Sequence, residues 1–121
     1  MRVHDSQGKT AHHTATCACG AVEIVLHAPP IATLSCCCDD CQAAAAELEA
    51  LPAAPAFREP CGGTPAVLFP RTALKVTRGR NKLEAHRRHP GARTKRMVTT
   101  CCNSFLYVGF DRGPFWVDVV T

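Results

Sequence analysis

The sequence lacks several features, and each absence removes a class of protein. No hydrophobic run approaches the roughly 20 apolar residues that a transmembrane helix needs. The first 16 residues are polar and histidine-rich and lack the apolar centre of a signal peptide, so we expect a cytoplasmic protein that has no membrane partner. There is also no repeat, phosphate-binding loop, dinucleotide-binding fingerprint or Ser-His-Asp order, so none of the corresponding enzyme classes is indicated.

The composition is typical of one globular domain. With 121 residues, of which 46% are hydrophobic and 20% charged, the chain can bury a modest core and does not resemble a disordered protein. We expect a flexible N-terminus over residues 1–15 and a single domain over residues 16–121. The nine cysteines are an odd number. In a reducing compartment such a set indicates metal binding together with a few free thiols.

The central cysteine motif, residues 36–41, is the most informative segment. Cys36 and Cys38 alternate on an extended segment, so their side chains point the same way. Cys41 follows at C-x-x-C spacing, where a turn can bring its thiol back toward the other two. Three protein ligands with a fourth position open are typical of a reactive zinc site. The alternatives are a structural site whose fourth ligand is distant in sequence, and a set of reduced thiols without metal.

A second cysteine set is divided between the two ends of the chain. Cys17 and Cys19 precede the first clear strand, and Cys101 and Cys102 come late. Two thiols from each end could form a closed structural zinc site, whose binding energy would become folding energy. Because adjacent side chains diverge on a strand, Cys17, Cys19 and Cys102 are the predicted ligands. Cys101 is either the fourth ligand or a buried thiol.

Alternating polar and apolar residues predict a mainly β domain. Runs typical of strands, separated by glycine and proline turns, cover residues 20–27, 31–36, 66–69, 74–77, 83–88, 95–100, 105–110 and 115–120. One short helix is predicted from an N-cap at Asp39 to Leu51. Residues 61–64 predict a tight turn that requires glycine.

The order of the cysteine motifs resembles the glutathione-dependent formaldehyde-activating enzyme family, also called the centromere-protein-V-like family. The resemblance rests on Cys17-Ala18-Cys19-Gly20, the central motif and Cys101-Cys102, and it is closest to a bacterial branch. It implies a β-tent of small antiparallel sheets with one short helix after the central motif. It also implies two zinc sites, a structural one on the first and last cysteine groups and a catalytic one on Cys36, Cys38 and Cys41.

The chain departs from the family pattern at two positions. Thr99 stands where the family usually has a structural ligand, so Cys101 could substitute from a shifted position. Cys37 stands in place of the usual histidine of the central motif, and we expect it to be a core residue. One or two zinc ions per chain are therefore expected. Cys61, beside a Gly-Gly pair, is an additional thiol that could approach the open position.

The resemblance implies carbon–sulfur lyase chemistry on a small thiol adduct, such as S-hydroxymethylglutathione. A zinc ion with three thiolate ligands exchanges a soft sulfur ligand readily and would hold the thiol as its thiolate. Asp39 and Asp40 lie inside the motif and are the proposed catalytic proton relay. Their alternative role is to cap the helix and complement its dipole.

Basic residues concentrate between Arg78 and Arg96. This stretch contains eight of the 14 lysine and arginine residues and a single acid, Glu84. One interpretation is a docking surface in which Arg87 and Arg88 bind an anionic thiol cosubstrate such as glutathione. The rival is a non-catalytic zinc module that binds nucleic acid or protein here, although no aromatic residue interleaves with the charges. The third interpretation is a solvated hairpin.

Overall fold

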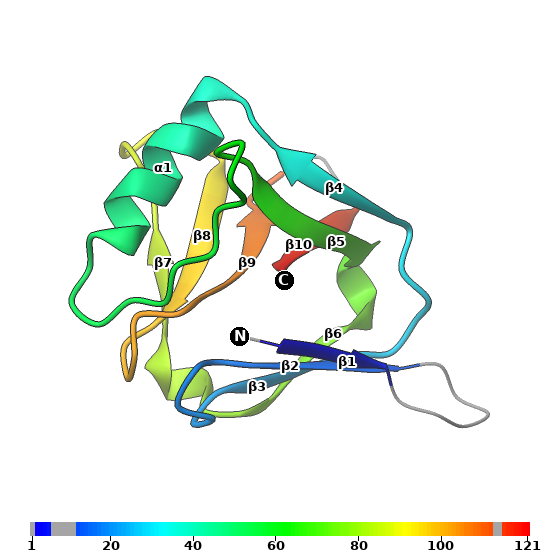
Figure 1. Cartoon of the computed structure of the whole chain (residues 1–121). Helices are drawn as coiled ribbons and strands as arrows, with labels where there is room; N and C mark the ends of the chain where they lie inside the picture. The colour runs from blue at the N-terminus through cyan, green and yellow to red at the C-terminus, as the bar shows by residue number, and fades with distance from the viewer. Residues whose placement is uncertain (1, 6–11, 113–114) are drawn as a thin grey trace.

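Two antiparallel sheets make up the protein. The computed structural model describes residues 2–5, 12–112 and 115–121. The four-stranded sheet has the order β1-β2-β3-β6, and the six-stranded sheet has the order β4-β5-β10-β9-β8-β7 (Figure 1). The strands are β1 (Arg2–Asp5), β2 (His13–Thr16), β3 (Glu23–Leu26), β4 (Ala32–Cys36), β5 (Thr64–Pro70), β6 (Leu74–Arg78), β7 (Leu83–His86), β8 (Thr94–Thr99), β9 (Phe105–Phe110) and β10 (Trp116–Val120).

The predicted fold class is confirmed. The described residues form one α-helix, α1 (Asp39–Glu49), whose first turn contains the end of the central cysteine motif, with two short 3-10 turns, η1 (Arg71–Ala73) and η2 (Arg80–Lys82). Each strand predicted from residue 20 onward corresponds to an observed strand. The predicted tight turn is also present, with Gly62 at φ 91° in the left-handed region that favours glycine.

The N-terminal segment over residues 1–15 contains strand residues that the sequence pattern did not predict. Its described part contains β1 and most of β2, and residues 6–11 lie outside the described residues. β2 pairs with β3 in the register Thr16↔Glu23, and Ala15 is fully buried. The sequence of β2 gave little signal because its inward residue is only an alanine. The ladder hydrogen bonds to β3, which local patterning does not show, hold it in place.

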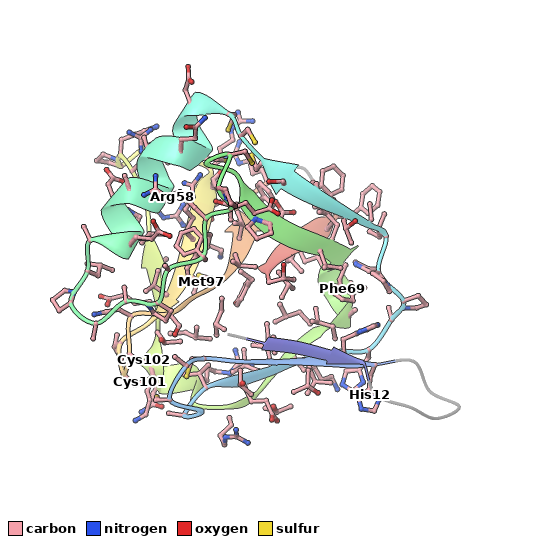
Figure 2. The ribbon with its side chains drawn as sticks, viewed as in Figure 1. His12, Arg58, Phe69, Met97, Cys101 and Cys102 are labelled. Carbon is pink, nitrogen blue, oxygen red and sulfur yellow. The ribbon has the colours of Figure 1, made fainter. Side chains whose placement is uncertain are left out.

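The main core lies between the two sheets. Phe69 of β5 packs with Ile24 and Leu26 of β3 and with Val117 and Val119 of β10. Figure 2 shows Phe69 in the space between the sheets. Because side chains alternate along a strand, the intervening residues of β10 face the opposite side of the six-stranded sheet. That opposite side carries the helix and, as described below, a cavity.

Helix α1 packs on this second face of the six-stranded sheet. Leu48 meets Val98, Phe105 and Val120 in a separate buried cluster. The loop after the helix is tied back by Glu49, whose carboxylate accepts the backbone N–H groups of Phe57 and Arg58. No helix of the described residues is long and apolar enough to cross a membrane.

The helix begins one residue earlier than predicted. Cys38, not Asp39, is the N-cap: its backbone is extended (φ −65°, ψ 159°), and its Sγ accepts the N–H of Cys41 at 3.2 Å. Asp39 and Asp40 therefore occupy the first helical turn, where carboxylates complement the helix dipole. A cysteine was not expected here because oxygen-bearing side chains are the usual N-caps. The helix start thus fixes the position of a central thiol.

Candidate functional site

Four cysteines gather where the two sheets meet. The Sγ atoms of Cys17, Cys19, Cys101 and Cys102 all lie within 4.8 Å of one another. Individual separations are 3.7 Å for Cys17–Cys19, 3.8 Å for Cys17–Cys101 and 3.9 Å for Cys101–Cys102. In Figure 2, Cys101 and Cys102 lie beside the turn that joins β2 to β3. Cys101, which the sequence left as ligand or buried thiol, is an exposed member of this four-cysteine cluster.

The spacing of these sulfurs fits a tetrahedral zinc ion. Zinc binds thiolate sulfur at about 2.3 Å, which places the sulfurs of a tetrahedral site about 3.8 Å apart. The measured separations of 3.7, 3.8 and 3.9 Å match that edge length. A set of four soft sulfur donors without an open position is typical of a structural site.

Backbone turns hold Cys17 in place. Its N–H donates to the carbonyl of Val22 at 3.1 Å, and its Sγ accepts the N–H of Val22 at 3.3 Å. Gly20, at φ 81°, reverses the chain between them and donates to the Cys17 carbonyl. The Cys17 side chain also packs with Val22 and Leu106. The cluster is therefore continuous with a small hydrophobic core that spans both sheets.

Thr99 supports the cluster from the end of β8. Its Oγ1 accepts the N–H of Ser104 at 3.0 Å and lies 3.4 Å from the Sγ of Cys102. Burial alone would raise the pKa of Cys102, but hydrogen bonds from Ser104 and Thr99 lower it to about 5. Burial and the neighbouring Cys19 thiol raise the pKa of Cys101 to about 12. Thr99 thus favours the thiolate of Cys102, although the chain has no ligand at position 99 itself.

Cys36, Cys38 and Cys41 form a second group, the three-cysteine cluster. Their Sγ atoms also lie within 4.8 Å of one another, with Cys36 and Cys38 at 3.5 Å. They come from the end of β4, the N-cap of α1 and its first turn. No other His, Cys, Asp or Glu side chain of the described residues joins this cluster. Hydrogen bonds from Cys41 lower the pKa of Cys38, whereas burial raises the pKa of Cys41.

The two remaining cysteines lie outside both clusters. Cys37 is exposed, so the expectation of a core residue is wrong. The chain leaves β4 at this point, and no layer of the protein covers the outward side chain. Cys61 is exposed as well, and it neighbours Cys37: partial desolvation and the Cys61 thiol both raise the pKa of Cys37. Gly63 packs so closely on the Cys37 Sγ that a Cβ would lie 2.7 Å from it.

A cavity of about 260 Å³ opens beside the three-cysteine cluster. Its wall is the second face of the six-stranded sheet, because alternate residues of β4, β5, β10, β9 and β8 point into it. The lining residues are Leu34, Cys36, Cys38, Asp40, Cys41, Thr64, Ala66, Thr94, Arg96, Phe105, Val108, Phe110, Asp118 and Val120. The sheet thus supplies a mostly apolar wall next to three thiols.

Of the two acids in the central motif, Asp40 lines the cavity and bridges two arginines. Its carboxylate oxygens accept Arg88 at 2.6 Å and Arg96 at 3.1 Å. These hydrogen bonds hold the pKa of Asp40 below its usual value. Arg96 is only 4% exposed, so Asp40 also balances a buried charge. Asp39 is exposed in the first helical turn.

The arginines proposed for an anionic cosubstrate both have carboxylate partners. Arg87 pairs with Asp111 at 2.7 Å, and Arg88 pairs with Asp40 and, at 3.5 Å, with Glu47. Within the basic stretch, Arg78, Lys95 and Arg96 also have a carboxylate within 4.0 Å. Five of the eight basic residues of this stretch therefore have a carboxylate partner within the protein.

Asp118 is the one cavity residue with acid–base chemistry that the sequence reasoning missed. It sits in β10 within the run Trp116–Val120, where the strand pattern alone suggests an ordinary outward polar residue. The signal that could have found it is the spacing of two residues between Asp118 and Val120, which places both side chains on the same face of the strand. Val120 is fully buried, so that face is covered. Since β10 is a central strand of its sheet, neither of its faces had to be solvated.

The metal content should distinguish the two clusters. We expect protein purified without added metal to contain two zinc ions per chain. Replacing Cys36, Cys38 and Cys41 together with serine should remove one zinc ion, with the circular-dichroism spectrum unchanged, because these thiols lie at the surface end of β4 and α1. The Cys61→Ser variant is the matched control and should retain both ions. Elemental analysis that finds no zinc in the wild type would contradict both assignments.

Comparisons with known proteins agree with the family that the sequence resembles and with the observed fold. A family model described as glutathione-dependent formaldehyde-activating enzyme matches residues 12–119. No curated protein matches the chain. Among solved structures, the crystal structure of a Rhodobacter sphaeroides protein, a structural-genomics target, is similar with a TM-score of 0.61 and 19% identity, covering 88% of this chain and 82% of that one. This last likeness shows the fold alone.

Proposed function

The chain belongs to the glutathione-dependent formaldehyde-activating enzyme family, and from this premise we propose that it is a zinc-dependent carbon–sulfur lyase-type enzyme acting on a small thiol adduct. One observation carries the proposal. Three thiols converge without a fourth ligand among the described residues, and they line a cavity of about 260 Å³. A purely structural site gains nothing from an incomplete ligand set that faces a cavity.

Cys36, Cys38 and Cys41 would hold the reactive zinc ion. Three thiolates and a divalent cation sum to a formal charge of −1 (+2 − 3), so the ion would be a weak Lewis acid with a preference for soft ligands. Its chemistry would be to keep a substrate thiol in the thiolate form. The pair of hydrogen bonds from Arg88 and Arg96 keeps Asp40 ionised, which makes it a poor proton donor and a good anchor for this end of the helix.

The four-cysteine cluster would hold a structural zinc ion. Its thiols come from segments 84 residues apart in the Cys17–Cys101 pair, so a metal there would fasten the four-stranded sheet to the six-stranded sheet. The two zinc ions would therefore have separate tasks, one in folding and one in substrate binding.

A non-catalytic zinc module that binds nucleic acid or protein is the second candidate. The observation in its favour is the clustering of eight basic residues between Arg78 and Arg96. Against it, five of these residues have a carboxylate within 4.0 Å. Displacing such ion pairs would offset part of the gain from phosphate contacts. The enzyme proposal is the better supported of the two.

Calorimetry with low-molecular-weight thiols tests the proposal. We expect the wild type to bind glutathione and the Cys38→Ser variant to lose that binding, because Cys38 belongs to the three-cysteine cluster. Cys61→Ser, which removes an exposed thiol outside both clusters, should bind glutathione like the wild type. If the wild type binds no thiol but binds DNA or RNA with a steep salt dependence, the second candidate replaces the enzyme proposal.

A further inference from the structure

The cavity extends well beyond the thiols that would bind a metal. Its volume of about 260 Å³ is close to the lower end of the 300–1,000 Å³ that is typical of small-molecule pockets. Phe105, Val108 and Phe110 supply apolar surface from β9, and Ala66 adds more from β5. Formaldehyde, with a single carbon, has no apolar group that could use such a wall. The wall fits an aliphatic or aromatic carbon chain.

Glutathione is a poor match for the same wall because it carries charged groups. Among the described residues that line the cavity, Arg96 is the one cation, and its guanidinium already donates to Asp40 at 3.1 Å. Burying a carboxylate of the thiol against Phe105 and Val108 would cost more than leaving it in water. The apolar wall therefore suits the carbonyl-derived part of a thiol adduct.

Asp118 places one polar atom in this wall that has no partner. Its Oδ1 is buried and accepts or donates no hydrogen bond among the described residues. The neighbours of Asp118 across the ladder are Leu68 of β5 and Val108 of β9, and both are apolar. A buried carboxyl oxygen without a partner is unfavourable unless a ligand completes it. The geometry thus indicates that Asp118 Oδ1 is placed to form a hydrogen bond with a hydroxyl or carbonyl oxygen of a ligand.

Burial also affects the pKa of this side chain. Desolvation, with no cation or N–H donor to counter it, raises the pKa of Asp118. The other carboxyl of the cavity, Asp40, already accepts hydrogen bonds from Arg88 and Arg96. Asp118 has no such partner at its Oδ1 among the described residues, so it is the carboxyl of this cavity that can exchange a proton with a ligand.

We propose that Asp118 is a catalytic residue that exchanges a proton with the hydroxyl oxygen of a hemithioacetal, and that the aldehyde part of this substrate is larger than formaldehyde and apolar. The proposal rests on the proposed function. Its two halves come from separate observations, the orphaned carboxyl oxygen and the apolar wall.

The proton balance of the reaction is simple. In the direction of synthesis, the substrate thiol has released its proton to water, and its sulfur forms a bond to the carbonyl carbon. The C=O π electrons move to oxygen, which takes the proton of Asp118 and becomes the hydroxyl. The Asp118 carboxylate then takes back one proton from water. In the lyase direction the carboxylate accepts the hydroxyl proton, the carbon–sulfur bond breaks, and the electron pair stays on sulfur.

The test is the rate at which free aldehyde and hemithioacetal exchange in the presence of glutathione, measured by NMR. For the wild type we expect the catalysed rate at low aldehyde concentration to be higher for butanal than for formaldehyde. Each buried methylene is worth about 4-fold, so three additional carbons give roughly 60-fold. Asp118→Asn should reduce the catalysed rate by about 10²–10⁴-fold, which is the usual size of general acid–base catalysis. Asp118→Glu should restore part of it.

Controls separate catalysis from structure. Asp118→Asn should retain two zinc ions, the wild-type melting temperature and glutathione binding in the calorimeter. Glu84→Gln removes an exposed carboxylate on β7, outside the cavity, and should keep the wild-type rate. The advantage of the wild type over Asp118→Asn in synthesis should decline as the pH rises through the pKa of Asp118, since the acid loses its proton. The other titratable or charged groups that line the cavity are Cys36, Cys38, Asp40, Cys41 and Arg96.

Three results would overturn the inference while leaving the proposed function standing. One is an Asp118→Asn variant that binds glutathione and exchanges butanal at the wild-type rate. Another is a wild type that binds glutathione but gives no advantage to butanal over formaldehyde, which removes the role of the apolar wall. Loss of zinc or of stability in Asp118→Asn would make the residue structural and would also overturn it. Failure of the proposed function is recognised separately, because the wild type would then bind no thiol.

Discussion

Replacing Cys17 with serine is expected to abolish cooperative folding or to lower the melting temperature by more than about 10 °C. Cys17 is 3% exposed, and its sulfur lies within 3.8 Å of both Cys19 and Cys101. Structural zinc contributes roughly 10–16 kcal/mol in zinc-finger peptides, whereas a whole domain is stable by about 5–15 kcal/mol. Losing this site therefore removes a large share of the free energy of unfolding. Thermal unfolding followed by circular dichroism measures the effect.

The comparison with the other cysteines makes this prediction specific. Cys61→Ser changes an exposed thiol and should alter stability by less than about 0.5 kcal/mol. The serine triple variant of the three-cysteine cluster should melt close to the wild type, because α1 remains anchored by the Leu48 cluster and β4 by its pairing with β5. A strong chelator should reproduce the Cys17→Ser result in the wild type. A Cys17→Ser protein that keeps two zinc ions and melts like the wild type would refute the structural role.

Most of the strands could be predicted because the spacing of apolar residues within each strand is visible in its own sequence. Val22, Ile24 and Leu26 recur at every second position beside the polar residues Glu23 and His27, and all three are fully buried. The same local reasoning failed for β2, because its one buried residue, Ala15, is a small side chain that gives no clear hydrophobic pattern. Strand pairing with β3 holds that segment, and pairing is not visible in the pattern of one strand.

The metal clusters were predictable to the extent that spacing fixes geometry. Cys36, Cys38 and Cys41 come together because an extended pair is followed by a helical turn, which the sequence indicates. Cys101 was ambiguous because adjacent side chains diverge on a strand. The chain resolves this by placing Cys101 and Cys102 in a turn, with Asn103 at φ 53°. In such a turn, successive side chains can reach the same point.

The cavity could not be predicted, because it depends on sheet order. Asp118 becomes a wall residue only when β10 lies between β5 and β9, and no local pattern gives that order. The carboxylate partners of Arg87 and Arg88 could not be predicted from the sequence either. Their partners Asp111 and Asp40 lie 24 and 48 residues away in the chain, so the ion pairs appear only after folding.

Replacing Phe69 with alanine is expected to lower the free energy of unfolding by about 3–5 kcal/mol, the usual cost of removing a fully buried phenylalanine. Phe69 is 0% exposed and packs against Ile24, Leu26 and Val119, so it joins the two sheets far from the four-cysteine cluster. Phe115→Ala is the matched control, because that ring is 70% exposed and should cost much less. Urea unfolding of both variants measures the difference.

The Phe69→Ala variant should also keep both zinc ions, in contrast to Cys17→Ser. The sheets are joined at two places, by the apolar core around Phe69 and by the four thiols beside Cys17 and its small core. Weakening the apolar contact lowers stability without changing a ligand. Phe69→Ala should therefore lose stability but keep its zinc content, whereas Cys17→Ser should lose both. If Phe69→Ala instead loses zinc at native conditions, the two joints are not independent, and the cluster depends on the packing of the sheets for its geometry.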